Sequence, residues 1–248
     1  MKPKVFSISL TVILIMTVAH MSAQERLNER GILPIYITPP IFPATEVVVH
    51  GQEAASINEY LFQHVEYPLA TAQKHYMGTE VVRFKVSAEG ELSSYEVINS
   101  VSPEIDEEVI RILATTSGNW IPGTINGIPS AQTREVSMVF KPHPKYDLVR
   151  DAREYQDKGN RMMFIKDHPG RAIKYYNRAV KLLPYEESIL AARCLCRYEM
   201  GDQKGALEDL DRIIALNPEI KERFKNASQD EYFSRLKTEV EQDFISAR

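Results

Sequence analysis

The side chains that could perform acid–base or metal chemistry do not form a catalytic set in this sequence. The densest acidic cluster is Glu104, Asp106, Glu107 and Glu108. These carboxylates fall in the first turn of a predicted helix, where the helix dipole favours negative charge, so their position explains them without catalysis. The six histidines are scattered, with no metal-ligand spacing. We therefore predict a protein that is not an enzyme, with no catalytic residue, no metal and no cofactor.

Redox chemistry is not indicated by the cysteines either. The two cysteines, Cys194 and Cys196, lie two positions apart in a predicted helix, so their side chains diverge and do not easily bridge each other. Neither lies near an evident base. We interpret them as buried, unpaired thiols.

Composition and charge restrict the class of protein. The chain has 248 residues, of which 44% are hydrophobic, and this is enough for one large or two small domains with their own cores. Its formal net charge is −4, so the basic footprint of a nucleic-acid-binding protein is absent.

The N-terminus has the pattern of an export signal. Lys2 and Lys4 precede an apolar run from Val5 to Ala19, and Ser22 and Ala23 form a small-residue exit. We predict a signal peptide over residues 1–23, cleaved after Ala23, and a periplasmic location. The alternative is an uncleaved inner-membrane anchor with the rest of the chain facing the periplasm, and only in that case is a membrane contact expected. N-terminal sequencing of the mature protein distinguishes the two.

Residues 24–50 are predicted to be an extended linker, with an isolated strand near residues 46–50. Four prolines occur here among β-branched residues, at positions 34, 39, 40 and 43.

Residues 51–141 have the pattern of a small α+β domain. A helical pattern over residues 54–74 is broken at Tyr67–Pro68. Alternating strands follow over residues 79–87 and 92–99, and a helix begins at Ser102–Pro103 and ends at Gly118. A last strand is predicted over residues 131–141. This order predicts a three-stranded antiparallel sheet with two helices on one face.

The chain from residue 146 onward has no strand pattern and carries a repeat of 34 residues. Four pairs keep this period: Ala172 and Ala206, Tyr176 and Leu210, Ala179 and Ile213, Pro184 and Pro218. Small alanines let two helices approach closely, and proline stops the second helix. We predict two helical hairpins over residues 146–218 and a capping helix region over residues 219–248. The predicted repeat-packing residues are Ala172, Tyr176, Pro184, Gly201, Ala206, Leu210 and Pro218.

An ordered series of motifs in residues 51–141 resembles the TonB C-terminal domain family. Its members in this sequence are Tyr67, Pro68, Gly78, Gly90, Trp120, Pro122 and Gly123, which we interpret as structural, with Tyr67, Trp120 and Phe140 in core or loop packing. The resemblance implies a periplasmic domain whose last strand adds a short segment of an outer-membrane transporter to the sheet edge. The candidate edge residues are Thr133, Arg134, Glu135, Val136, Ser137, Met138 and Val139.

The hairpins resemble tetratricopeptide (TPR) repeats. Gly201–Asp202 stands at the turn of the second hairpin, and Lys158–Gly159–Asn160 lies in the first helix. In some repeats of this type, a lysine four positions before such an asparagine holds a peptide carboxylate. Here that position is Gln156, so a carboxylate clamp is not expected.

Together these patterns predict an exported protein that binds other proteins through both modules, as an accessory to outer-membrane transport. One alternative is an anchored energy transducer of the TonB type for outer-membrane transporters. A second alternative is an inhibitor or subunit of an envelope enzyme. Partners are expected to be proteins, such as a transporter segment or an envelope complex, and not nucleic acids.

Overall fold

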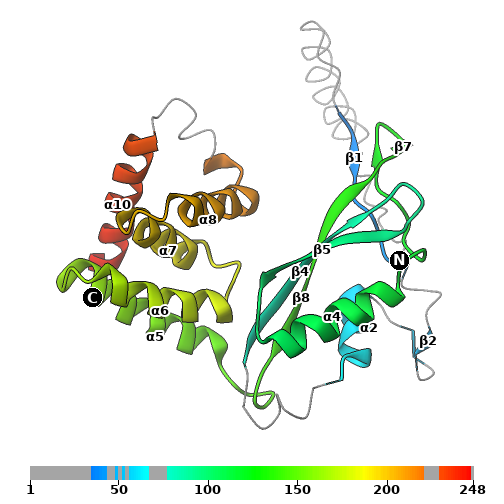
Figure 1. Cartoon of the computed structure of the whole chain (residues 1–248), viewed down its shortest axis with the longest axis horizontal. Helices are drawn as coiled ribbons and strands as arrows, with labels where there is room; N and C mark the ends of the chain where they lie inside the picture. The colour runs from blue at the N-terminus through cyan, green and yellow to red at the C-terminus, as the bar shows by residue number, and fades with distance from the viewer. Residues whose placement is uncertain are drawn as a thin grey trace, which may run out of the picture.

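The structure is a computed structural model, which describes residues 35–43, 48–49, 52–53, 56–66, 77–220 and 229–246. A sheet module and a helical module lie side by side (Figure 1). Among the described residues, no helix has the length and apolar character needed to cross a bilayer. The predicted signal peptide, Tyr67 and Pro68 lie outside the described residues.

The main sheet has three antiparallel strands in the order β5-β4-β8. They are β4 (Gly78–Val86), β5 (Leu92–Asn99) and β8 (Gln132–Phe140). β4 lies in the centre between β5 and β8, and five of its first six residues are buried. The turn between β4 and β5 includes Gly90, whose φ of +85° suits glycine.

Two helices cover one face of this sheet. They are α2 (Ile57–His64), capped by Ser56, and α4 (Pro103–Thr115), capped by Ser102 with Pro103 in its first turn. The core between sheet and helices is apolar, with Leu61 from α2 and Leu113 from α4 fully buried. The prediction of an α+β fold with a three-stranded antiparallel sheet and two helices, followed by an all-α region, is confirmed.

A second small sheet contradicts part of the linker prediction. β1 (Ile37–Thr38) pairs with β6 (Thr124–Ile125), which pairs with β7 (Ile128–Pro129). Phe42 is buried and packs near Tyr60 and Trp120, with ring centroids 5.5 and 5.4 Å away. Residues 35–43 are therefore part of the folded sheet module, because their strand partner and their aromatic pocket lie elsewhere in the chain. A further pair, β2 (Val48–Val49) with β3 (Gln52–Glu53), follows.

The helical module consists of two hairpins and a last helix. The first hairpin joins α5 (Leu148–Asn160), which continues as the π-helix η1 (Arg161–Ile165), to α6 (Pro169–Leu182). The second joins α7 (Glu187–Glu199) to α8 (Gln203–Leu216). The last helix is α10 (Gln229–Ser246), which contacts α7 through stacked rings of Phe233 and Tyr198, 3.9 Å between centroids. Figure 1 shows α10 running across the ends of the hairpin helices.

Candidate protein-binding surfaces

β8 is an edge strand of the main sheet. All nine of its residues pair with β4, from Gln132 opposite Val86 to Phe140 opposite Gly78. In the described part of the chain, no strand pairs with its other side. In an antiparallel pair, successive residues direct their backbone N–H and C=O groups alternately toward the neighbour and away from it. Half of the backbone groups of β8 therefore point toward the free edge, where an extended segment could bind them.

The side chains of β8 divide between the two faces of the sheet. Val136, Met138 and Phe140 are buried against the helices. On the opposite face, the Glu135 Oε1 atom accepts hydrogen bonds from Arg83 Nη2 at 2.9 Å and Nε at 3.1 Å. Val139 is 51% exposed on this strand. The structure thus places the seven predicted edge residues on one edge strand, with side chains on both faces of the sheet and, within the described ranges, no strand paired with the second side of β8.

The family-motif glycines mark close backbone approaches. At Gly90, a Cβ atom would overlap the Trp120 carbonyl oxygen, and at Gly123 it would lie 2.6 Å from the Thr38 carbonyl oxygen of β1. Gly78 has a φ of +148°, and a Cβ atom there would lie 2.8 Å from the Lys181 carbonyl oxygen of α6. The absence of a side chain at Gly78 therefore allows the close contact between the two modules. The sequence motif does not reveal this role. Pro122 is half-buried between Ile121 and Gly123.

Trp120 is a core residue of the sheet module. Its ring lies 5.3 Å from Phe84 in an edge-to-face arrangement, and its Nε1 donates to Thr116 Oγ1 at 3.0 Å. A buried tryptophan with its N–H satisfied contributes apolar area and fixes its surroundings. The structure thus places Trp120 and Phe140 in the core.

The C-terminal end of α6 is bound to the sheet module by polar groups. The last carbonyl groups of a helix have no partner within the helix. Here Thr79 Oγ1 donates to the Leu182 carbonyl at 2.7 Å, and Asn99 Nδ2 donates to the Lys181 carbonyl at 3.1 Å. In return, Lys181 Nζ donates to the Val101 carbonyl at 2.7 Å. Residues of β4 and β5 therefore cap α6 and fix it on the sheet.

Buried next to this contact is Glu80, which sequence reasoning missed. Its Oε2 accepts a hydrogen bond from the Val101 backbone N–H at 2.7 Å. Burial raises the pKa of Glu80 to about 8, and nearby Asp106 adds to this effect, while the Val101 bond and the Lys181 charge oppose it. The one available signal was an acid at position 80 directly before the apolar pair Val81–Val82 of the central strand.

A polar cleft of about 580 Å³ separates the open face of the sheet from α7 and α8. Arg212 of α8 reaches across it to Glu135, with Nη1 3.4 Å from Oε1, and lies over the Tyr185 ring at 4.9 Å. Glu135 thus joins Arg83 of its own sheet and Arg212 of the helical module. The other two arginines of the cleft, Arg193 and Arg197, pair with Asp209. The shared pairing of Arg83 and Arg212 with Glu135 supports a fixed contact between the modules.

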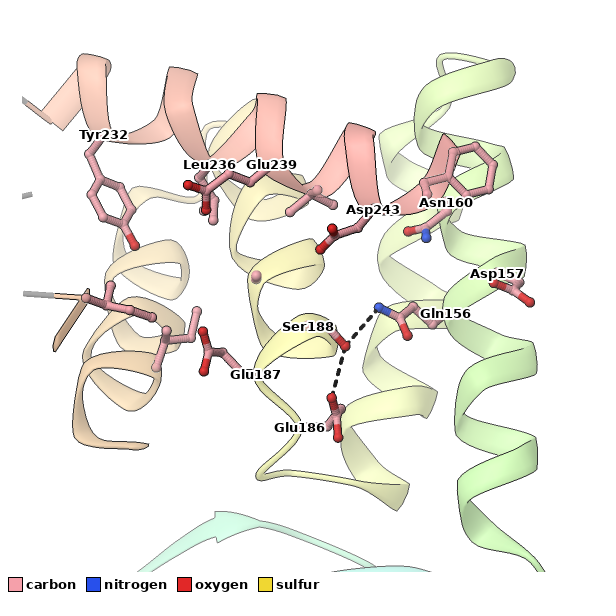
Figure 2. A pocket seen from close by; sticks show the side chains of 15 residues that line it. Gln156, Asp157, Asn160, Glu186, Glu187, Ser188, Tyr232, Leu236, Glu239 and Asp243 are labelled. Carbon is pink, nitrogen blue, oxygen red and sulfur yellow. Dashed lines mark hydrogen bonds between the residues drawn. The ribbon is translucent and has the colours of Figure 1, made fainter. Parts of the chain in front are cut away.

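The helical module contains a second concave site, a groove of about 420 Å³ between α5, α7, α8 and α10 (Figure 2). Figure 2 shows carboxylates on both sides of it, with Glu186 and Glu187 at the start of α7 and Glu239 and Asp243 on α10. Asp157 of α5 also lines the groove, and no lysine or arginine does so in the described part of the chain. The floor is apolar and includes Ala191, Ile213, Leu236 and Val240. The groove therefore combines an acidic rim with an apolar floor.

The predicted repeat residues lie where the helices of each hairpin meet. Ala172, Tyr176 and Ala206 are fully buried, and the Tyr176 hydroxyl donates to Asn160 Oδ1 at 2.9 Å. A Cβ atom on Gly159 would lie 2.7 Å from Tyr176 Cδ1, so glycine makes room for this ring. The structure places the other predicted residues, Pro184, Gly201, Leu210 and Pro218, at the ends of the hairpin helices or on α8.

Gln156 stands on the groove and does not supply a cation. Its Nε2 donates to Ser188 Oγ at 3.3 Å, and Ser188 Oγ donates to Glu186 Oε1 at 3.1 Å (Figure 2).

The cysteines face the protein interior, where burial raises the pKa of both Cys194 and Cys196 to about 12. A thiol with such a pKa is almost entirely protonated at neutral pH and is a weak nucleophile.

Comparison with known proteins supports both resemblances. Residues 63–142 match the family described as Gram-negative bacterial TonB protein C-terminal. A wheat (Triticum aestivum) protein named Hsp70-Hsp90 organizing protein is 27% identical over 137 residues, which cover 55% of this chain and 22% of the wheat protein. The chain thus spans about a fifth of the length of this curated relative. No solved structure matches the chain.

The TonB C-terminal match coincides with the sheet module, and the low-identity relative hints at the tetratricopeptide region. The TonB family is a feature of the bacterial envelope and serves protein interaction. The chain is accordingly one in which a segment similar to the TonB C-terminal family, residues 63–142, is followed by helical hairpins similar to tetratricopeptide repeats.

Proposed function

We propose that this chain is an exported, periplasmic protein-binding protein, whose main binding site is the free edge of β8. The observation that carries the proposal is that β8 pairs along its whole length with β4 and with no strand on its other side in the described residues. An extended segment of a partner, such as a periplasmic segment of an outer-membrane transporter, would continue the sheet through backbone hydrogen bonds.

The groove of the helical module is proposed as the second binding surface. Asp157, Glu186, Glu187 and Asp243 have no ion pair with a lysine or arginine among the described residues. Charge complementarity therefore favours a partner segment with basic and apolar side chains. The name of the wheat relative refers to Hsp70 and Hsp90. In this chain, however, Gln156 occupies the position where some tetratricopeptide repeats carry a lysine that holds a peptide carboxylate, and its amide offers no positive charge. We therefore propose a different class of ligand for this groove.

An accessory role is favoured over that of an energy transducer. A transducer must bridge the space between its anchor and a transporter in the other membrane. Fifteen residues lie between Ala19 and Ile35, where the described sheet module begins, and the chain between these two residues spans at most about 55 Å when fully extended. The predicted linker, residues 24–50, would have given a longer reach, but residues 35–43 are part of the folded sheet module. An intact N-terminus in isolated membranes would instead support the transducer.

Site-specific photocrosslinking tests the edge. A photoreactive residue at Thr133 or Val139, both exposed, should crosslink to a partner in the envelope of the producing cell. The same residue at Leu207, exposed on α8, is the control position. Discovery of a hydrolase or protease as the crosslinked partner would support the alternative of an enzyme inhibitor or subunit.

Proline substitutions then separate strand addition from other contacts. One set replaces Thr133, Glu135, Ser137 and Val139 one at a time, and the other replaces Arg134, Val136 and Met138. The N–H groups of only one set point away from β4, so prolines there should remove crosslinking with little unfolding, as judged by circular dichroism. Persistent crosslinking in every folded proline variant would show that the contact is not strand addition.

A further inference from the structure

The two helices of the sheet module divide the main sheet between them. α4 contacts β4 and β5, whereas α2 contacts β8, so α2 is the helix beside the free edge. A strand added at this edge would lie about 4.8 Å beyond β8, and every second side chain of it would point to the face that carries α2. Side chains of α2 therefore lie within reach of half the side chains of an added strand.

Phe62 lies on the flank of α2 that faces away from α4. An α-helix turns by about 100° per residue, so Tyr60 and Phe62 lie on opposite flanks of Leu61. Leu61 is fully buried in the core, and the Tyr60 hydroxyl lies 3.4 Å from Thr115 Oγ1 of α4. Because α4 covers β4 and β5, the opposite flank of α2 faces the free edge of β8. Phe62 projects from this flank and is 77% exposed.

The same face of β8 carries a cation without a partner. Arg134 alternates with Val136 and Met138, whose side chains are buried on the helix side of the sheet. Its side chain is half-buried, its Nε has no hydrogen-bond partner, and within the described ranges no carboxylate pairs with it. A buried donor without a partner costs free energy. A carboxylate on an added strand, opposite Arg134, would supply that partner.

The contribution of α2 does not follow from the family resemblance. The match to the TonB C-terminal family begins at residue 63, whereas α2 begins at Ile57 and Phe62 precedes the match. An apolar contact at Phe62 would therefore be a property of this chain, added to an edge strand that lies within the match.

We propose that Arg134 and Phe62 select the sequence of the strand that binds at the edge of β8. The selected strand carries an acidic residue opposite Arg134 and, on the same face, a large apolar residue that packs against Phe62. Side chains on one face of a strand are an even number of residues apart. This inference rests on the proposed edge binding and names the side chains that the edge accepts, in contrast to the basic segment proposed for the groove.

Selection of random peptides tests this inference. Peptides of nine residues, the length of β8, are displayed on phage and selected on the immobilised full chain. Those that the wild-type protein retains and the folded proline variants of β8 release are the edge ligands. We expect acidic and large apolar residues to occur together at even spacing at least about threefold more often than at odd spacing among these edge ligands.

Variants at the two positions assign the preferences. Arg134→Glu should reverse the selected charge, so that lysine or arginine takes the place of the acid. Arg134→Gln should remove the charge preference, and it replaces the first variant if that one does not fold. Phe62→Ser should remove the apolar preference and keep the acid, because position 62 is exposed and its replacement leaves the core intact. Arg153→Glu and Leu207→Ser, at exposed positions of α5 and α8, are the controls and should keep both preferences.

Two results would overturn this inference and leave the edge binding intact. The first is a set of edge ligands without even spacing of acidic and apolar residues. The second is the same enrichment in the variants at 62 and 134 as in the wild-type protein. Failure to find any peptide whose binding depends on β8 would contradict the proposed function itself, and this inference would fall with it.

Discussion

Glu80 shows how a single side chain ties pH to the stability of the module contact. The carboxyl group is fully buried between β4 and α4, with Lys181 of the helical module close by. Its pKa is raised from 4.5 to about 8, mainly by burial, so the folded protein holds this group protonated at neutral pH. In the unfolded chain the same group is ionised above about 4.5.

The resulting pH dependence has a defined sign. Below a pH of about 4.5 both states are protonated, so Glu80 makes its full contribution to stability and causes no pH dependence there. As pH rises toward about 8 the unfolded state loses its proton first, so the contribution of Glu80 to stability is lost across this window. A shift of this size corresponds to a loss on the order of several kcal/mol, with each pKa unit worth about 1.4 kcal/mol.

The variant Glu80→Gln should remove this dependence, because the amide keeps an oxygen for the Val101 N–H and carries no charge. Urea unfolding at several pH values is the measurement. Wild type and variant should differ little near pH 5 and diverge toward pH 8, with the variant the more stable. Glu107→Gln, at an exposed position of the neighbouring helix α4, is the control. A constant difference between wild type and E80Q from pH 5 to pH 8 would contradict the assignment.

At the scale of elements, the junction of β4 with α6 depends on the absence of a side chain at position 78. Gly78 begins β4 with a φ of +148°, where L residues are strained, and the Lys181 carbonyl occupies the place of a Cβ atom at 2.8 Å. This nearest atom is backbone, so it cannot move aside without shifting α6 or β4, whereas the next two neighbours, at 3.2 and 3.3 Å, are side-chain atoms of Lys181 and Val101.

Gly78→Ala should therefore lower the free energy of unfolding by about 1 to 3 kcal/mol. Gly170→Ala is the matched control, since it lies in the first turn of α6 with no atom near its Cβ position. That control should be neutral or stabilising by up to about 1 kcal/mol. Thermal unfolding followed by circular dichroism compares the two, and equal stability of the two variants would contradict this account of Gly78.

Elements with a local signal were predicted closely. β4, β5 and β8 follow alternating patterns, and α4 begins at Ser102–Pro103 as its capping sequence indicates. The docking of residues 35–43 was missed because β1 pairs with β6, more than 80 residues away, and no local pattern records such a partner. The π-helix η1 at the end of α5 also had no signal in the sequence.

The binding site was likewise predicted only in part. The edge position of β8 was expected from the resemblance to the TonB C-terminal domain family, whereas the residues that bind the two modules together were not predicted. Thr79, Asn99, Lys181 and Arg212 are ordinary polar residues in sequence, and their importance arises from partners that lie 77 to 103 positions apart. The motif glycines at 78 and 123 were assigned to structure, but their neighbours, α6 and β1, were visible only in three dimensions.

At the scale of the whole molecule, the two modules are joined by buried and half-buried polar contacts. Glu135 accepts from Arg83 within the sheet module and faces Arg212 of α8, while Thr79 Oγ1 caps α6. Contacts of this kind are strongly destabilised when one partner is removed, because the other is left unpaired. We therefore expect the modules to unfold together as one cooperative unit.

The double variant Thr79→Val with Arg212→Ala should uncouple the modules. Trp120 fluorescence reports on the sheet module, and far-ultraviolet circular dichroism reports mainly on the helices. In urea, the two signals should change together in wild type and separately in the variant, with a loss of about 2 to 4 kcal/mol in the less stable module. Arg150→Ala, which removes an exposed ion pair on α5, should leave the transitions coincident. Coincident transitions in the double variant would refute the coupling.

The edge binding proposed for β8 has a mechanical consequence. A partner strand bound along its edge and pulled along its own axis would load the backbone hydrogen bonds in shear, so that many bonds resist together. The same strand is held through Glu135 to Arg212, and its neighbour β4 is held through Thr79 to the end of α6. Tension arriving at the edge would therefore pass into the helical hairpins through two separate points, and the chain would respond to traction as one stiff body.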